Sequence, residues 1–212
     1  MKITLQKREK PYLVRFFLDN GTDFAIDLDL ANELCLKVGD TISEEKIKEL
    51  KENSDYLRAK KRALWYLDRS FRTEKELYDK LITAGFPKKA SAKVIARFKE
   101  LCLIDDRLYA KRYAEQCIDK NISKREIYAR LLKKGINKEL IAETLDITEC
   151  DETCQIKALI DKKYYRYLSD TADKKAVQKV FAALARKGFS FGAIKTALKE
   201  YTASLEYIDE EC

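Results

Sequence analysis

Residues 73–86 read TEKELYDKLITAGF, a stretch that specifies the start and the buried face of one helix. Thr73 and Glu76 have the spacing of a capping box. In that motif the hydroxyl accepts from the Glu76 amide and the carboxylate accepts from the Thr73 amide. Leu77 and Leu81 are four residues apart and therefore share one helical face.

The end of the same helix is also specified. Gly85 stands where a helix closes with a left-handed residue, a conformation that costs other residues about 1–2 kcal/mol. With Gly85 as the C′ residue, Phe86 and Leu81 make the apolar contact of a Schellman motif. We therefore expect a short helix with a fixed start, face and stop.

The pattern recurs along the chain. Residues 123–136 read SKREIYARLLKKGI and match every offset of the first copy after a shift of 50 residues. A looser third copy contains Val180, Leu184 and Gly188, and Asp173 is its expected cap. An internal period near 50 residues is typical of stacked supersecondary units.

These repeats predict a mainly α protein, with tandem three-helix repeats in an elongated curved array. A small N-terminal antiparallel β-sheet is expected from short strands at 3–5, 12–18 and 24–28, which are rich in β-branched and aromatic residues. Such a sheet is too small to stand alone. The expected parts are the sheet with short helices at 1–55, three-helix units at 56–105, 106–150 and 151–205, and an acidic tail at 206–212.

Two capped helices are expected between the strands and the first unit. Asp27 or Asp29 caps a short helix, and Ser43 begins another. A separate helix from Tyr56 to Asp68 then opens the first unit. At the start of the second unit, Asp105 or Asp106 is the expected N-cap, although paired aspartates leave a metal or acid–base site as the alternative.

The composition indicates a binding protein rather than an enzyme. The chain has 212 residues, 46% of them hydrophobic and 37% charged, which indicates a helix-rich soluble protein. No run is long and apolar enough to cross a bilayer and no signal peptide is recognised, so a cytoplasmic location is expected. Histidine is absent, and no phosphate-binding glycine loop or nucleophile motif occurs.

Six cysteines occur, none in a CxxC motif. Cys150 and Cys154 leave a two-thiolate metal pair open, but structural zinc usually takes four ligands. Reduced thiols in a cytosolic protein are the favoured interpretation, and no metal is expected.

Positive charge is concentrated in the middle of the chain. Residues 58–138 hold 23 Lys/Arg against 10 Asp/Glu, whereas residues 1–57 hold 9 against 12 and residues 139–212 hold 11 against 14. Such a field attracts nucleic acid or an acidic protein surface, unless the lysines only solvate helical faces. The candidate partner- or DNA-binding residues are Lys60, Lys61, Arg62, Arg69, Arg72, Lys111, Arg112, Lys124, Arg125, Arg130, Lys133 and Lys134. We expect Lys124, Arg125 and Arg130 to be exposed.

Together these motifs resemble the signature of the RecX regulatory family over roughly residues 56–200. The residues that carry the resemblance are Ala63-Leu64, Leu67, Arg69, Thr73-Glu74, Glu76-Leu77, Leu81, Gly85-Phe86, Ile104-Asp105-Asp106 and Tyr109-Ala110. The strands followed by residues 36–40 resemble the extension of RecX proteins of Gram-positive type. The third repeat departs from the pattern because it lacks the capping box.

The resemblance implies a cytoplasmic, non-enzymatic modulator that needs no cofactor. RecX proteins mostly inhibit the recombination and ATPase activities of the RecA recombinase in DNA repair and the SOS response, and are thought to lie in the groove of the RecA–DNA filament. The implied partner is that filament, with direct contact to single-stranded or duplex DNA left open, no membrane contact, and a monomeric state.

Two other classes of function stay open from the residues. Basic three-helix units also build DNA-binding proteins, so a RecA-independent protein with tandem helix-turn-helix-like units is the main alternative. The other is a helical scaffold that neither modulates RecA nor binds DNA. The run Tyr164, Tyr165 and Tyr167 could stack nucleobases, although such tyrosines more often pack a helix against its neighbour.

Overall fold

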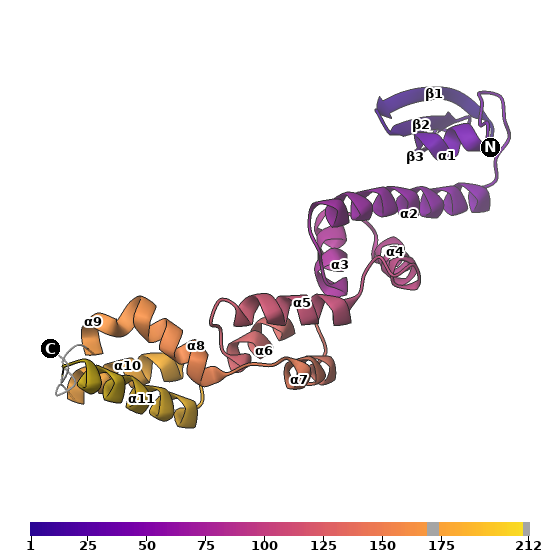
Figure 1. Cartoon of the computed structure of the whole chain (residues 1–212). Helices are drawn as coiled ribbons and strands as arrows, with labels where there is room; N and C mark the ends of the chain where they lie inside the picture. Colours follow the sequence, from indigo (N-terminus) through magenta and orange to yellow (C-terminus); the bar gives the residue numbers. More distant parts are fainter. Residues whose placement is uncertain (169–173, 210–212) are drawn as a thin grey trace. The chain divides into compact units, whose positions relative to one another are not determined.

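The computed structural model describes residues 1–168 and 174–209, with backbone only from residue 203 onward. The chain divides into two compact units at Asp105/Asp106. Unit 1 holds the sheet and the first repeat, and unit 2 holds the second and third repeats (Figure 1). Each unit is described by itself. The mainly helical fold with a small antiparallel sheet confirms the predicted fold class.

The sheet of unit 1 has three antiparallel strands in the order β1 (Ile3–Lys10), β2 (Leu13–Leu18) and β3 (Asp23–Asp27). Phe16 of β2 pairs with Phe24 of β3, and both side chains are buried. Strand β1 is longer than predicted. Its residues after Ile3 are exposed and, apart from Leu5, polar, because an edge strand pairs through its backbone and carries charge on its surface.

Helix α1 (Leu28–Glu33) begins directly after β3. Asp27 is its N-cap and accepts from the Asp29 amide at 3.1 Å, which confirms one of the two predicted caps. Val14, Phe16, Ile26 and Ala31 join residues of the next helix in one hydrophobic core. This core gives the small sheet the support that it needs.

Helix α2 (Glu44–Arg69) begins at the predicted cap, where Ser43 accepts from the Lys46 amide at 3.2 Å. The prediction of two separate helices in this region is wrong. One helix of 26 residues runs through positions 51–55, since that segment contains neither glycine nor proline. Its first half packs under the sheet through Ile47 and Leu50, and its second half opens the first repeat.

The first repeat consists of the second half of α2 with α3 (Glu74–Thr83) and α4 (Lys88–Glu100). Thr73 and Glu76 form the predicted capping box. The Phe86 amide donates to the Leu81 carbonyl at 3.1 Å and the Gly85 amide to the Ile82 carbonyl at 2.9 Å, which is the hydrogen-bond pattern of a Schellman motif. The second copy repeats this ending at Gly135 and Ile136.

The second repeat consists of α5 (Asp106–Ile118), α6 (Lys124–Lys133) and α7 (Lys138–Ile147). Ser123 accepts from the Glu126 amide at 3.3 Å, as the spacing predicts. The same hydroxyl donates to the Lys187 carbonyl at 2.6 Å in the third repeat. Ser123 therefore caps α6 and joins two repeats of unit 2.

The third repeat begins with α8 (Glu152–Leu159), one turn of π-helix η1 (Ile160–Tyr164) and α9 (Tyr165–Leu168). It continues with α10 (Lys174–Arg186) and α11 (Phe191–Asp209). The π turn had no signal in the sequence. Asp173, the expected cap, lies outside the described residues, as do residues 210–212 of the predicted acidic tail; residues 206–209 belong to α11.

The three predicted helix stops have the predicted backbone. Gly85, Gly135 and Gly188 have φ values of 87°, 87° and 88°. At Gly188 space is also short, because a β-carbon there would lie 2.8 Å from Ser123 Oγ. A β-carbon at Gly85 would meet nothing within 4 Å. The third copy of the motif is therefore under a constraint that the first does not share.

Candidate partner-binding surfaces

The predicted partner-binding residues fall into two sets, one in each unit. Lys60, Lys61, Arg62 and Arg69 lie on the second half of α2, and Arg72 lies in the loop before α3; all five belong to unit 1. The remaining seven belong to unit 2. Lys111 and Arg112 lie on α5, and Lys124, Arg125, Arg130, Lys133 and its C-cap Lys134 lie on α6.

In unit 1 the arginines lie on aromatic rings. Arg69 Cζ is 3.7 Å from the centroid of Trp65, and Arg62 Cζ is 4.5 Å from it. Trp65 and Tyr66 meet edge to face at 5.3 Å, and Arg72 Cζ is 5.9 Å from the Tyr66 centroid. Because a ring fixes a guanidinium without neutralising it, this surface stays positive. We name Arg62, Trp65, Tyr66, Arg69 and Arg72 the α2 surface.

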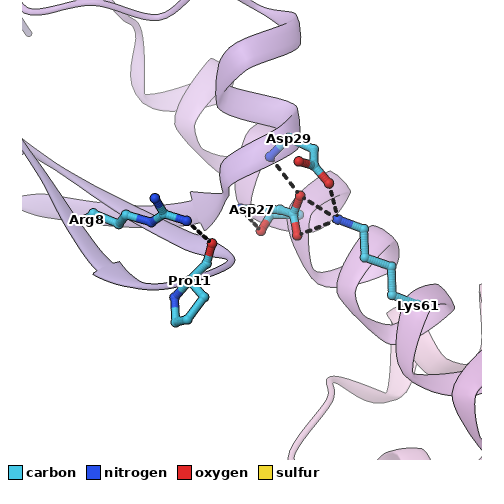
Figure 2. A network of polar contacts seen from close by, with 6 residues as sticks. Arg8, Pro11, Asp27, Asp29 and Lys61 are labelled. Carbon is cyan, nitrogen blue, oxygen red and sulfur yellow. Dashed lines mark hydrogen bonds and ion pairs between the residues drawn. The ribbon is translucent and has the colours of Figure 1, made fainter.

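Lys61 has a structural role beside this surface. Its Nζ lies 3.0 Å from Asp27 Oδ1 and 2.6 Å from Asp29 Oδ2, across the start of α1 (Figure 2). Asp27 is fully buried, so Lys61 compensates a carboxylate that water does not reach. The hydrogen bond to Asp29 is the main cause that raises the Lys61 pKa, and Asp27 adds to it. Lys60, the neighbouring candidate, is half-buried on α2.

Arg58 belongs with these arginines, although sequence reasoning missed it. Its Cζ lies 5.9 Å from the Tyr12 centroid and 5.8 Å from the Phe86 centroid. Arg58 stands four residues before Arg62 on α2, so the two share a helical face. That spacing was available in the sequence. The aromatic partners, which come from distant segments, were not.

In unit 2 the cations are bound more closely within the protein. Arg130 Nε donates to Glu126 Oε1 at 2.9 Å, and this bond is the main cause that raises the Arg130 pKa. Tyr109 and Tyr113 stack at 6.0 Å, with Lys134 Nζ 5.3 Å from the first ring and 5.4 Å from the second. Burial raises the pKa of Tyr113.

Lys124 corrects an expectation. Its Nζ donates to the Leu145 carbonyl at 2.6 Å, near the C-terminus of α7, and its side chain is half-buried. A cation at a helix C-terminus stabilises the last carbonyls. The expected exposure holds for Arg125 and Arg130, but Lys124 is part of the packing of the second repeat.

The other candidates of unit 2 are exposed. Lys111, Arg112 and Lys133 all have exposed side chains. Lys111 also lines a depression of about 530 Å³ beside Arg107 and Glu143, which form an ion pair. Because that depression contains both signs of charge and an exposed Ile147, it has no strong preference for a polyanion.

The described cysteines are free and differ in their surroundings. Cys150 Sγ donates to Gln155 Oε1 at 3.2 Å, whereas Cys154 Sγ donates to Asp151 Oδ2 at 3.1 Å. Within residues 1–168 and 174–209, no group of three or more acidic or cysteine side chains is placed to hold a metal ion. No helix in this part of the chain is long and apolar enough to cross a membrane.

The chain matches known family models in all three repeats. The models are the RecX first three-helix domain over residues 59–98, the second over 105–145 and the third over 151–198. Two curated relatives are both called regulatory protein RecX. The relative from Clostridium tetani is 30% identical over 201 residues, covering 94% of this chain and 92% of the relative. The relative from Clostridium acetobutylicum is 32% identical over 203 residues, covering 94% of each.

Solved structures agree with these matches. A crystal structure of regulatory protein RecX has a TM-score of 0.68 at 25% identity, covering 92% of this chain and 98% of that one. The crystal structure of RecX from Lactobacillus salivarius has a TM-score of 0.62 at 28% identity, covering 69% and 96%. The fold thus defines a tandem three-helix-repeat protein of a regulatory class. The chain belongs to the RecX family.

Proposed function

We propose that this protein restrains the RecA recombinase by binding the RecA–DNA filament through its first and second repeats. The observation that carries the proposal is the match of all three repeats, in order, to a family of regulatory proteins. The cationic surfaces support it, since a nucleoprotein filament offers both phosphates and acidic side chains.

In the proposed mechanism the protein acts by binding to the filament and catalyses no reaction. Exposed arginines on the α2 surface and exposed cations of α5 and α6 would bind the filament and hinder its growth or its ATP turnover. This mode of action needs no catalytic residue and no cofactor. We propose that the protein acts in the cytoplasm, as a monomer.

The test is the effect of the purified full chain on DNA-dependent ATP hydrolysis by RecA. We expect hydrolysis to fall as the protein is added, at ratios below one per RecA subunit. A matched assay follows binding to random duplexes without RecA. If RecA activity is unchanged while one duplex sequence is bound tightly and in preference to others, the protein is a RecA-independent DNA reader and the proposal is wrong.

A further inference from the structure

A pocket of about 340 Å³ opens in unit 1 beside the α2 surface. Tyr12 of the turn between β1 and β2 forms one side, and Phe86 follows the end of α3. Arg58, Arg62 and Trp65 reach it from α2. We propose that this pocket binds one unstacked nucleotide of single-stranded DNA, with the base on the aromatic walls and the phosphate on the arginines. The proposal does not depend on the regulation of RecA.

The walls combine rings and flat cations. The Arg58 guanidinium lies between two rings, at 5.9 Å from Tyr12 and 5.8 Å from Phe86. Trp65 is 40% exposed and Tyr12 is 48% exposed, so both side chains reach the surface. Because Arg62 and Arg69 lie on the Trp65 ring and Arg58 lies near the Tyr12 ring, a base stacks on the uncovered part of a ring or on a guanidinium plane. Proteins that bind single strands stack bases on such rings and on arginine planes, because every base has a flat π-face.

The charges of the pocket select an anion. Asp27 is a carboxylate that lines it, and Lys61 Nζ lies 3.0 Å and 3.2 Å from its two oxygens. Lys61 is shared between Asp27 and Asp29, and Arg58 Nη1 has one long contact of 3.7 Å with Asp55 Oδ1. Among the described residues Arg62 has no ion pair, so we infer that Arg62, with Arg58, binds the ligand. Arg58 Nε is also buried without a hydrogen-bond partner in the described part of the chain. Because Nε itself is closed to solvent, a phosphate oxygen would bind the arginines through their other nitrogens, in charge-assisted hydrogen bonds.

The turn that carries Tyr12 is held in place. The Tyr12 carbonyl accepts a hydrogen bond from the Leu28 amide at 3.0 Å. The Arg8 guanidinium donates to the neighbouring Pro11 carbonyl at 2.7 Å (Figure 2). These bonds use only backbone atoms of the turn, so they hold Tyr12 in place without engaging its ring, which Arg58 Cζ approaches at 5.9 Å. A pre-formed wall lowers the ordering cost of binding.

Size and shape favour a single strand. The volume lies at the lower end of the range for small-ligand sites, which fits one base with its phosphate. A base inside a duplex is stacked and paired, so its faces are not available to the walls. An acidic peptide would satisfy the arginines but would bring no flat ring to Tyr12 and Trp65.

Trp65 is the one tryptophan of the chain, so intrinsic tryptophan fluorescence reports on Trp65, which belongs both to this pocket and to the α2 surface. The Tyr12 variants described below separate the two. The full chain is titrated with a short thymidine oligonucleotide, with an abasic strand of equal length and charge, and with a duplex of that length. We expect the thymidine strand to change the fluorescence. We also expect it to bind about 5- to 150-fold more tightly than the abasic strand, the range for stacking one base.

Two tyrosine variants locate the effect. Tyr12→Ser should remove most of the advantage of the thymidine strand, whereas Tyr12→Phe should keep it. Phe191→Ser is the control, since Phe191 is an aromatic side chain that is 70% exposed at the start of α11 and is not a candidate binding residue. Circular dichroism verifies that each variant is folded.

Four results would overturn the proposal. In the first, the abasic strand or the duplex binds as tightly as the thymidine strand. In the second, Tyr12→Ser and Phe191→Ser bind alike. In the third, thymidine monophosphate binds as tightly as the strand, which would assign the pocket to a free nucleotide. In the fourth, poly-glutamate changes Trp65 fluorescence as strongly as the strand does, which would assign the pocket to an acidic protein.

Discussion

The first repeat in unit 1 and the second repeat in unit 2 share the same kind of N-cap and a glycine helix end, but their cations make different contacts. Arg62 and Arg69 lie on the Trp65 ring. Lys124 instead donates to the Leu145 carbonyl, and Arg130 pairs with Glu126. An ion pair cancels charge and a ring does not. A count of cations therefore does not rank binding surfaces. Unit 1 holds five candidate cations and unit 2 holds seven, yet we expect unit 1 to contribute more to polyanion binding.

The largest effect on stability is expected at a helix stop of unit 2. Gly188→Ala should lower the free energy of unfolding by about 2–4 kcal/mol, because the left-handed penalty adds to a clash with Ser123 Oγ. Gly85→Ala in unit 1 should cost only about 1–2 kcal/mol, since the space there is open. Urea unfolding measures both, and equal costs would contradict the role of Ser123.

A double variant separates the two causes at Gly188. Ser123→Ala removes the hydroxyl that a new β-carbon would meet at 2.8 Å. Ser123→Ala should therefore lower the free energy of unfolding less in the Gly188→Ala background than in the wild type. Additive costs would mean that the Ser123 hydroxyl does not contribute, which would leave the backbone conformation and the Arg125 β-carbon, 3.2 Å from the new methyl group, as the causes.

A middle-sized effect is expected at the two structural lysines. Lys61→Met should lower the free energy of unfolding by about 1–3 kcal/mol, because Asp27 stays buried without its cation. Lys124→Met removes a partner of helix carbonyls and should cost about 0.3–1 kcal/mol. Thermal or urea unfolding measures the loss of stability in both variants. A larger loss for Lys124→Met than for Lys61→Met would contradict this prediction.

The smallest effect is a change in salt dependence. If about four phosphates are neutralised, the logarithm of affinity for single-stranded DNA should fall with the logarithm of salt concentration at a slope near −3. Removing two cations of the α2 surface, as in Arg62→Gln with Arg69→Gln, should reduce the slope by about 1.4. A flat dependence in the wild type would mean that these cations only solvate the helix.

Local signals made the helix ends predictable. Thr73, Glu76 and Gly85 each act through neighbours within five residues, so their spacing in the sequence determines their contacts. The boundaries assigned to the three units and the curvature of the array stay predictions. The long α2 was missed because the first unit was expected to begin with its own helix at Tyr56, although residues 51–55 contain no residue that ends a helix.

The binding surface was less predictable because its contacts are distant in sequence. The charge concentration over residues 58–138 indicated the part of the chain that supplies the proposed surfaces. It could not show that Lys61 would bind Asp27, or that Arg58 would lie between Tyr12 and Phe86. Charge counts locate a surface, but only tertiary contacts show which cations are used inside the protein.

The claim that unit 1 contributes more to binding than unit 2 is tested most directly by the inhibition of RecA by two matched double variants. Arg62→Gln with Arg69→Gln removes two positive charges from unit 1, and Lys111→Gln with Lys133→Gln removes two exposed ones from unit 2. The measured quantity is the protein concentration that halves DNA-dependent ATP hydrolysis by RecA. We predict a rise of about tenfold for the unit 1 variant, corresponding to about 1.4 kcal/mol of binding, and a smaller rise for the unit 2 variant. Equal rises, or a larger rise for unit 2, would contradict the claim that the arginines on Trp65 form the stronger surface.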